Sequence, residues 1–427
     1  MELNQIHHLF LNSSGVSTDT RNITNNSLFF ALKGVNFNGN SFAHQALEGG
    51  ASYAVIDEVV DFNDERFILV DNVLETLQTL ANFHRKYLGL PIIALTGSNG
   101  KTTTKELIHA VLKPHFKTVA TVGNLNNHIG VPLTLLGMTA STEIGIVEMG
   151  ANHVKEIAML CEIAQPNMGY ITNFGKAHLE GFGSEEGVVK AKSELYAHLK
   201  ENSGLIILNS DDYKQVAQVG NYNSVYTFSE SLKTSVNVKL TSRYPFLNVS
   251  LNNTEIQTHL VGIYNFHNIA AALAIGTYYE LTASQLKKGI EAYVPANNRS
   301  QIIKKNSNEI VLDAYNANPS SMEVALENFK SIQNQHKLAI LGDMFELGPT
   351  SAKEHLAVIN QAISTKDCSF YFVGSHFFEQ KIDHPTLLFF ETYNNLQMHL
   401  EKTTILNRSI LIKGSRGMAL ERVLELI

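Results

Sequence analysis

The chain has 427 residues, of which 44% are hydrophobic and 17% are charged. Because a single core stops growing near about 250–300 residues, we expect two or three domains, each able to bury a core. The net charge of -7 comes without a basic block, so the composition gives no reason to expect nucleic-acid binding.

The N-terminal sequence MELNQIHHLF lacks the basic and apolar segments of a signal peptide, and no run reaches the roughly 18 apolar residues of a transmembrane helix. We therefore expect a cytoplasmic protein without membrane insertion. Cys161 and Cys368 form no Cys-x-x-Cys pair, which argues against a disulfide framework or a zinc site. Both are predicted to be packing residues.

Residues 1–84 mix short apolar runs with polar, turn-rich pieces, a pattern typical of a small α/β domain. From Leu90 the chain shows nearly continuous apolar runs that end in glycine or polar residues, which indicates strands buried in a parallel sheet. These runs are residues 91–97, 144–150, 168–175 and 204–212. Between the first two, residues 102–116 show helical periodicity, with an apolar face of Leu107, Ile108, Val111 and Leu112.

The next part of the chain changes pattern. Residues 225–261 alternate polar and apolar side chains, which predicts antiparallel strands with a turn at Asn252 and Asn253. A helix is expected at 265–279. After Pro295 the strand and helix rhythm restarts, which predicts a third, Rossmann-like domain. Its expected strands are 309–315, 337–344, 369–375, 386–390 and 409–415.

The sequence TGSNGKTTT at residues 96–104 stands where a buried strand gives way to a helix. Glycines let backbone N–H groups approach phosphate oxygens, the helix N-terminus adds positive potential, Lys101 supplies a point charge, and a threonine hydroxyl can reach Mg²⁺. Leu95 replaces the first glycine of the full phosphate-loop pattern, so only Gly-x-x-Gly-Lys-Thr remains. The alternative is a glycine-rich turn with a surface lysine, but the order of strand, turn and helix favours ATP or GTP binding.

Glu148 and His178 follow two further predicted strands. The carboxyl ends of the strands share one crevice in a doubly wound sheet, so both side chains are expected near phosphates bound after Thr96. A carboxylate suits Mg²⁺, whereas a single imidazole is a less usual ligand of that ion. Taken alone, Glu148 could cap a helix and His178 could be a loop histidine, but their shared edge with the glycine-rich loop favours a metal site.

Long motifs in matching order resemble the Mur ligase family from residue 19 to residue 423. They include GNLNNHIGVPLTLL (123–136), VEMGANHVKEI (147–157), NFGKAHLEGFGSEEGVVKAKSELY (173–196), DAYNANPSSM (313–322) and LGDMFELG (341–348). The similarity is strongest to the family member that adds D-alanyl-D-alanine to UDP-MurNAc-tripeptide, a cell-wall precursor.

The resemblance implies an α/β protein of three domains that makes an amide bond with ATP. Residues 1–84 would bind the UDP substrate, 85–296 would form a P-loop ATPase with a mostly parallel sheet, and 297–427 would be a Rossmann-like domain that brings the amine. In the family an acyl phosphate forms on the peptide carboxylate, and an amine then displaces phosphate. Lys101 and Mg²⁺ can stabilise the charge on the transferring phosphoryl group. We expect a monomer.

The resemblance implies which residues of this chain bind nucleotide and metal, because they stand at positions that match the family's motifs. The expected cofactor-binding residues are Gly97, Ser98, Asn99, Gly100, Lys101, Thr102, Thr103, Asn265, Asn268, Arg299 and Asp313. The expected metal residues are Thr102, Glu148, His178 and Lys192, and Lys101, His178 and Lys192 are the expected catalytic residues. Lys192 matches a lysine that CO₂ carbamoylates, which turns a cation into an anion able to approach Mg²⁺. Without the resemblance, Lys192 would be interpreted as an unmodified surface lysine, and Asn265 and Asn268 as helix caps.

The resemblance also implies substrate-binding residues. Those facing the UDP moiety are Ser17, Asp19, Arg21, Lys33 and Gly34, those near the peptide are Asn126 and Asn127, and those facing the central domain are Tyr315, Asn316 and Asn318. Lys413, Ser415 and Arg416 are typical of this ligase without an assigned role. A folding role is the alternative for these polar residues. Tyr264 departs from the family, which commonly has histidine there.

Three other functions remain as alternatives. A sister Mur ligase would add a single amino acid, although YNANP and LGDMFELG favour the dipeptide-adding member. Folylpolyglutamate synthase shares the ATP-binding scheme but would not need the N-terminal UDP segment. A P-loop regulatory switch would have no use for a second α/β domain rich in polar motifs.

Overall fold

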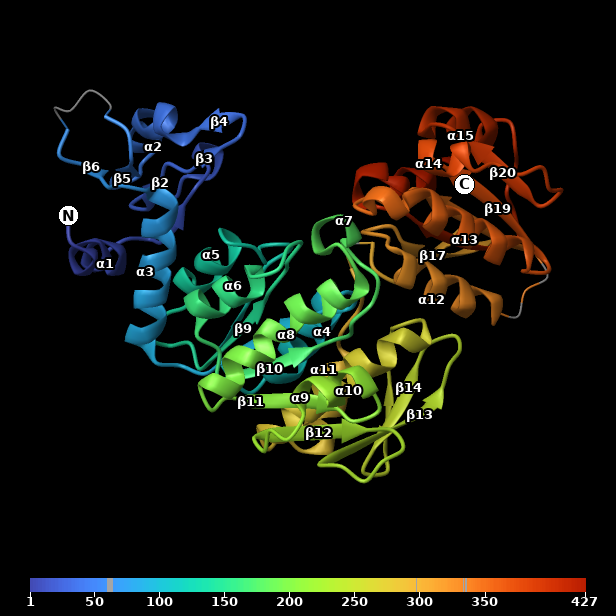
Figure 1. The fold of residues 1–427 in the computed structure, drawn as a ribbon, viewed down its shortest axis with the longest axis horizontal. Coiled ribbons are helices and arrows are strands. Elements are labelled where there is room, and N and C mark those ends of the chain that lie inside the picture. The colour runs from blue at the N-terminus through green and yellow to red at the C-terminus, as the bar shows by residue number, and fades with distance from the viewer. Residues whose placement is uncertain (60–63, 297, 333, 335) are drawn as a thin grey trace.

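The computed structural model describes residues 1–59, 64–296, 298–332, 334 and 336–427. Three larger sheets follow one another along the chain, and in Figure 1 they form an N-terminal body at the upper left, a central body below and a C-terminal body at the upper right. The predicted three-domain α/β architecture is confirmed. The boundary predicted at 84/85 falls inside helix α3, and residue 297 lies outside the described residues, so the domain limits stay a proposal.

The N-terminal domain is a small parallel sheet of order β1-β2-β5-β6 joined to the central domain by helix α3. Helix α3 begins where the Asn72 side chain accepts a hydrogen bond from the Glu75 N–H and ends at Gly89, and it packs against α5 and α6. The elements are α1 (Leu3–Leu11), β1 (Val16–Ser17), β2 (Leu28–Phe30), β3 (Lys33–Gly34), β4 (Phe37–Asn38), α2 (Ala43–Glu48), β5 (Tyr53–Ile56), β6 (Phe67–Leu69) and α3 (Val73–Leu88).

The central sheet has the order β15-β14-β13-β12-β11-β10-β7-β9-β8, which places β7 between β10 and β9. Its first elements are β7 (Ile92–Thr96), α4 (Lys101–Leu112), β8 (Thr118–Ala120), α5 (Gly130–Leu136), β9 (Ile144–Glu148), α6 (Glu156–Ala164), β10 (Met168–Ile171), α7 (Leu179–Phe182) and α8 (Glu185–Glu201). Strands β7, β9 and β10 are buried throughout and run parallel, as predicted. The predicted apolar face of α4 is fully buried.

The second half of the central domain corrects one expectation. Its elements are β11 (Leu205–Asn209), α9 (Tyr213–Val219), β12 (Val225–Ser229), β13 (Val236–Ser242), β14 (Asn248–Leu251), β15 (Thr254–Gln257), α10 (Phe266–Tyr278) and α11 (Ala283–Glu291). Our prediction of antiparallel strands is wrong for β12, which runs parallel to β11 because helix α9 carries the chain back before β12 begins. The prediction is also wrong for the pair β12 and β13, which is parallel. Strand β14 runs antiparallel to both β13 and β15, and both residues of the Asn252-Asn253 turn have positive φ, as a tight hairpin requires.

The C-terminal sheet has the order β16-β17-β21-β18-β19-β20, and its strands other than β16 are parallel. We did not predict β16, which forms an antiparallel hairpin with β17 at the sheet edge. The elements are β16 (Gln301–Lys305), β17 (Asn308–Asp313), α12 (Pro319–Lys330), β18 (Lys337–Gly342), α13 (Ser351–Ile363), β19 (Cys368–Val373), α14 (Ser375–Glu379), β20 (Leu387–Phe390), α15 (Tyr393–Leu400) and β21 (Ser409–Lys413).

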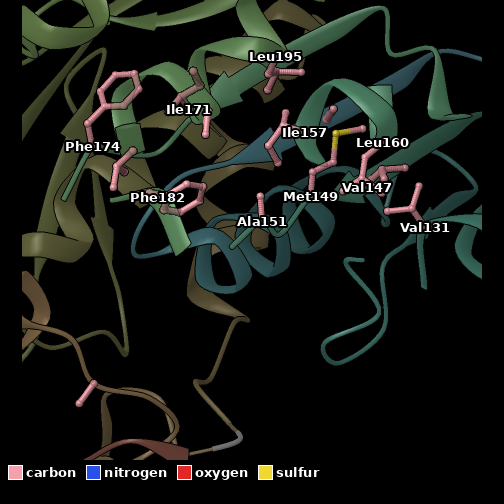
Figure 2. Close-up of a cluster of buried hydrophobic side chains, with 14 of the residues drawn as sticks. Val131, Val147, Met149, Ala151, Ile157, Leu160, Ile171, Phe174, Phe182 and Leu195 are labelled. Carbon is pink, nitrogen blue, oxygen red and sulfur yellow. The ribbon is translucent and has the colours of Figure 1, made fainter. Parts of the chain in front are cut away.

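Apolar packing holds strand β9 and helix α8, which carry the predicted site residues Glu148 and Lys192. Figure 2 shows Val147 and Met149 around the end of β9 close to Ile157 and Leu160 of α6, with Leu195 of α8 in the same cluster. All five side chains are at most 1% exposed. Dense packing of this kind tolerates little movement, so Glu148 on β9 and Lys192 on α8 stand on a rigid base. Both cysteines are free and buried, which confirms that they are packing residues.

Candidate active site

A cavity of about 940 Å³ lies between the central and C-terminal domains. It is lined by the loop after β7, by segments that follow β9, β10 and β11, and by the first loops of the C-terminal domain. The register pairs Leu95 with Glu148 and Thr96 with Ile171, so these central strands end at one edge. Carboxyl ends of parallel strands are where doubly wound sheets bind ligands.

Most of the predicted site residues line this cavity. They are Ser98, Asn99, Gly100, Lys101, Thr102, Thr103, Asn126, Asn127, Glu148, His178, Asn265, Asn268, Arg299, Asp313, Tyr315, Asn316 and Asn318. Among the other predicted residues, Gly97 and Lys192 lie behind the lining, and Ser17, Asp19, Arg21, Lys33 and Gly34 belong to the N-terminal domain.

The loop between β7 and α4 depends on two glycines. Gly97 has a φ of 142°, and a Cβ atom there would stand 2.0 Å from the hydroxyl oxygen of Thr172. Gly100 caps α4 with a φ of 80°, and a Cβ atom there would stand 2.6 Å from the side-chain oxygen of Asn268. Side chains are therefore excluded at both positions, and the N-terminus of α4 with its free N–H groups is left open to the cavity.

Lys101 is folded back into this loop. Its Nζ donates to the carbonyl oxygen of Gly97 at 2.8 Å and to that of Ser98 at 3.4 Å. Burial lowers the pKa of Lys101, and the nearby charge of Glu148 opposes that effect. An amine in this position can exchange carbonyl partners for phosphate oxygens, which are stronger acceptors.

Glu148 offers one free carboxylate oxygen. Its Oε1 accepts from Asn126 Nδ2 at 2.8 Å and from the Thr102 hydroxyl at 3.3 Å, whereas Oε2 is buried without a hydrogen-bond partner in the described part of the chain. A buried, unpaired carboxylate oxygen is costly unless a cation or a donor reaches it. Carboxylate and hydroxyl oxygens fit Mg²⁺, which takes few protein ligands and completes its shell with phosphates and water. Within the described residues, no group of three or more His, Cys, Asp or Glu side chains could hold a metal alone.

His178 lines the same cavity but pairs across the domain boundary. Its Nδ1 faces a carboxylate oxygen of Glu346 in an ion pair, and this contact holds the pKa of the Glu346 carboxyl below its usual range. The backbone carbonyl of Glu346 also accepts from the N–H of Glu180, in helix α7. The metal role of His178 stays a prediction, and Glu346 is a partner that the sequence interpretation did not identify.

Lys192 is the most deeply buried of the predicted catalytic residues, with 1% of its surface exposed. Its Nζ donates to the carbonyl oxygen of Ala151 at 3.2 Å and stands 5.0 Å from the centre of the Phe182 ring. Burial, with a smaller contribution from the charge of Lys101, lowers the pKa of Lys192 well below its usual value. The alternative of an exposed surface lysine is therefore wrong, and burial favours the neutral amine, the form that can act as a nucleophile.

Asn265 and Asn268 connect helix α10 to helix α4. Asn268 Oδ1 accepts from the Thr104 hydroxyl at 3.0 Å, Asn268 Nδ2 donates to Asn265 Oδ1 at 2.8 Å, and Asn265 Nδ2 donates to the Val261 carbonyl at 2.8 Å. Both side chains are at least 96% buried. The chain of bonds holds the start of α10 against the phosphate-loop helix, and neither side chain caps α10.

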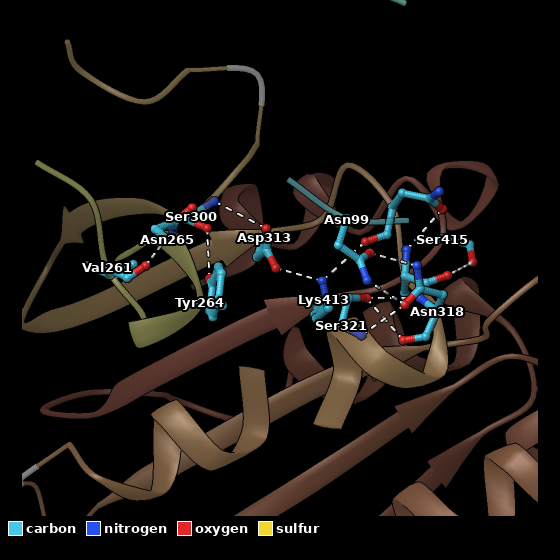
Figure 3. Close-up of polar contacts among 12 residues, drawn as sticks. Asn99, Val261, Tyr264, Asn265, Ser300, Asp313, Asn318, Ser321, Lys413 and Ser415 are labelled. Carbon is cyan, nitrogen blue, oxygen red and sulfur yellow. Dashed lines mark hydrogen bonds and ion pairs between the residues drawn. The ribbon is translucent and has the colours of Figure 1, made fainter. Parts of the chain in front are cut away.

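Arg299 and Asp313 lie on the C-terminal side of the cavity. The Arg299 guanidinium stacks 3.6 Å from the centre of the Tyr315 ring, and its buried Nε has no hydrogen-bond partner among the residues that the structure describes. Asp313 accepts from the Ser300 N–H at 3.2 Å and forms a 2.6 Å ion pair with Lys413, and the hydroxyls of Tyr264 and Ser300 lie 2.8 Å apart (Figure 3). A stacked guanidinium with an unused donor is suited to phosphate.

Two asparagines join the loop after β7 to the C-terminal domain. Asn318 Nδ2 donates to Asn99 Oδ1 at 2.7 Å, and Asn318 also caps α12 by accepting from the Ser321 N–H (Figure 3). In the central domain, Asn127 accepts from the N–H groups at the start of α5. These three polar residues therefore have structural contacts. The nucleotide contact of Asn99 and the substrate contacts of Asn127 and Asn318 stay predictions.

The N-terminal residues predicted to face the UDP moiety are mostly exposed and paired with neighbours. Arg21 forms a 2.6 Å ion pair with Asp19, whose pKa this contact lowers to about 2. Lys33 approaches Asp57 at 3.0 Å and Glu58 at 3.3 Å. The Ser17 hydroxyl donates a hydrogen bond to the Asp19 carbonyl, and Gly34 lies under the ring of Phe37.

The sequence interpretation did not assign a site role to some of the residues that line the cavity. Asn209 ends β11 and contacts His267 at 3.2 Å, and a consistent use of the strand-end rule would have found it. Lys413 was noted without a role, and its pairing with Asp313 follows from the register of β17 and β21, in which the two residues are partners. The two residues are 100 positions apart in the sequence, so the sequence alone does not indicate that contact.

The helices in the described part of the chain include none that is long and apolar enough to cross a membrane.

Comparisons with known proteins agree on one family. The Mur ligase family catalytic domain matches residues 12–85, the Mur ligase middle domain matches 95–276, and the Mur ligase glutamate ligase domain matches 298–388. A Bacillus subtilis protein named UDP-N-acetylmuramoyl-tripeptide–D-alanyl-D-alanine ligase is 35% identical and aligns with 96% of this chain and 92% of its own.

Solved structures agree with that result. A crystal structure of MurF from Acinetobacter baumannii has a TM-score of 0.85 and 30% identity, covering 96% of this chain and 92% of its own. MurF ligase from Thermotoga maritima in complex with ADP has a TM-score of 0.85 and 26% identity, covering 98% and 97%. Similarity of this extent, through all three domains, shows that the chain belongs to the Mur ligase family.

Proposed function

We propose that this protein joins D-alanyl-D-alanine to UDP-MurNAc-tripeptide in an ATP-dependent reaction of peptidoglycan synthesis, giving UDP-MurNAc-pentapeptide, ADP and phosphate. The observation that carries the proposal is the cavity between two domains, which is lined by a glycine-rich loop with Lys101 and by Glu148 with its unpaired carboxylate oxygen, while the buried Lys192 stands behind the lining. The names of its relatives support the same reaction. We also propose that the protein acts in the cytoplasm as a monomer.

ATP would bind along this cavity. The N–H groups at the start of α4, Lys101 and the free Nε of Arg299 supply donors for the phosphates, while Asp313 is an acceptor suited to a ribose hydroxyl. Donors fixed in a water-poor site stabilise charge that develops on a transferring phosphoryl group. Asn265 and Asn268 would lie at the adenine end.

Mg²⁺ would be held by Glu148 and Thr102, with His178 as a further candidate ligand, because Glu148 Oε2 is a buried carboxylate oxygen without a partner among the described residues. When bound, such an ion neutralises phosphate charge. We also propose that CO₂ carbamoylates Lys192. A neutral buried amine can attack CO₂, forming a C–N bond and releasing a proton, and the product is an anion.

The amine would come from the C-terminal domain. Tyr315, Asn316 and Asn318 line the cavity opposite the phosphate loop, so an acceptor bound there faces the acyl phosphate. An α-amino group has an unperturbed pKa near 7.7–8.0, so about a tenth is neutral at pH 7, and holding it in place can matter more than a strong base.

The choice of acceptor tests the proposal. ADP release in the presence of UDP-MurNAc-tripeptide should rise strongly with D-Ala-D-Ala and should stay at its background rate with free L-amino acids, meso-diaminopimelate or glutamate. A single amino acid acting as the better acceptor would support the sister ligase instead. An ADP release rate that does not change with any added amine would favour a regulatory ATPase.

A further inference from the structure

The C-terminal domain contacts the central domain next to His178. His178 Nδ1 faces the Glu346 carboxylate across this boundary, and the Glu346 carbonyl accepts from the Glu180 N–H at 3.2 Å. A Cβ atom at Gly348 would stand 3.3 Å from Glu180, so the two backbones approach closely. Glu346 is therefore attached to the segment around helix α7 through both its side chain and its backbone.

This contact decides which nitrogen of His178 is free. A carboxylate facing Nδ1 favours the tautomer whose proton is on Nδ1, which leaves the lone pair of a neutral ring on Nε2; within the described residues the contact is one of charge and proximity, because Nδ1 has no hydrogen bond of regular geometry. Carboxylates that fix the tautomer and orientation of a histidine in this way are common behind metal ligands. His178 lines the cavity that also contains Glu148, whose Oε2 has no partner.

We propose that Glu346 is a positioning residue which, supplied by the C-terminal domain, orients His178 toward the cation site of the central domain. This rests on the proposed function, specifically on its use of a divalent cation. The cation site is then complete only when the C-terminal domain is docked. Docking also brings the acceptor amine, so the acyl phosphate forms when an amine is at hand and is protected from hydrolysis.

A second carboxylate across the same boundary provides a matched control. Glu354 approaches Lys176 at 3.6 Å, and neither residue lines the cavity. Removing the Glu354 side chain weakens docking without touching His178. Removing the Glu346 side chain weakens docking and releases the imidazole, so a comparison of the two variants separates orientation from docking.

The test is Mn²⁺ binding to the full chain without nucleotide, followed by electron paramagnetic resonance of free Mn²⁺. Glu346→Ala should weaken Mn²⁺ binding by about 10–100-fold, the usual effect of losing a residue that orients a metal ligand. Glu346→Gln should retain most of the affinity because its amide oxygen can still accept from Nδ1. Glu354→Ala should lose much less affinity than Glu346→Ala, because it weakens docking but leaves the His178–Glu346 contact in place.

A double-mutant cycle with His178→Ala completes the test. If Glu346 acts through His178, Glu346→Ala should add nothing in the His178→Ala background. Additive effects, a loss below about tenfold in Glu346→Ala, an equal loss in Glu354→Ala, or no Mn²⁺ binding by the wild type would each overturn the proposal. Ligation of D-Ala-D-Ala by the wild type, measured on the same preparation, reports separately on the proposed function.

Discussion

The nucleotide end and the N-terminal end of this protein use charged residues in opposite ways. At the nucleotide end, Lys192 and Glu148 are 1% exposed, and Glu148 keeps an oxygen without a partner. At the N-terminal end, the Arg21 side chain is 85% exposed and that of Lys33 is 44% exposed, and each is already paired with a carboxylate. The buried carboxylate at the nucleotide end therefore lacks a partner until a ligand binds. The exposed charges at the N-terminal end already have partners.

This difference sets how much each residue should matter. A buried charge gains a great deal from a ligand because water is absent, so its removal is costly. An exposed ion pair is screened by water and contributes little. We therefore expect large effects from Lys101 and Lys192 and small effects from Arg21 and Lys33.

The largest effect should come from Lys101→Ala, which removes the fixed cation of the phosphate loop. We expect kcat/KM for ligation to fall by about 100–1,000-fold, while circular dichroism shows an intact fold. Lys113→Ala is the control, because Lys113 is an exposed lysine at the other end of helix α4. Retention of more than about a tenth of the activity would contradict the phosphate assignment.

Lys192→Ala should come next, with a loss of about 10–100-fold if its carbamate orients the cation and the acyl phosphate. Short carboxylic acids should restore part of the activity by occupying the vacated space. The exposed Lys190 on the same helix supplies the control variant Lys190→Ala. Unchanged ligation by Lys192→Ala at low CO₂ would show that Lys192 serves only in packing.

Arg299→Ala should have an intermediate effect. Loss of its free donor should raise KM for ATP by about tenfold, the size of one charged hydrogen bond, with little change in KM for D-Ala-D-Ala. Arg408→Ala removes a similarly half-buried arginine elsewhere in the C-terminal domain and should leave both KM values unchanged. Equal increases in the two KM values would point to a disturbed domain rather than a lost phosphate contact.

The smallest effect should come from Lys33→Ala. We expect KM for UDP-MurNAc-tripeptide to rise by about fivefold or less, without a change in KM for ATP, because the lysine is exposed and already paired. Arg66→Ala breaks a comparable exposed pair with Asp64 in the same domain and should change neither value. A loss of activity in Lys33→Ala as large as that in Lys101→Ala would contradict the proposed difference between the nucleotide end and the N-terminal end.

The sequence interpretation succeeded where local rules apply. Strand ends in a parallel sheet share an edge, and the register of β7, β9 and β10 brings Glu148 next to the phosphate loop as predicted. It failed where contacts depend on sheet order or domain docking. Lys413 meets Asp313 only because β21 lies beside β17, and Glu346 meets His178 only because two domains touch. Strand β16 was missed because it lies half-buried at the sheet edge, so its sequence QIIKK shows neither a continuous apolar run nor a strict alternation.

The product of the complete reaction tests the central claim most directly. The protein should be incubated with ATP, Mg²⁺, UDP-MurNAc-tripeptide and D-Ala-D-Ala, and the nucleotide-linked products weighed by mass spectrometry. The account predicts a product heavier than the tripeptide precursor by one D-Ala-D-Ala less one water, formed in equal amount to ADP. ADP formation with an unchanged precursor, or a precursor extended by a single amino acid, would contradict it.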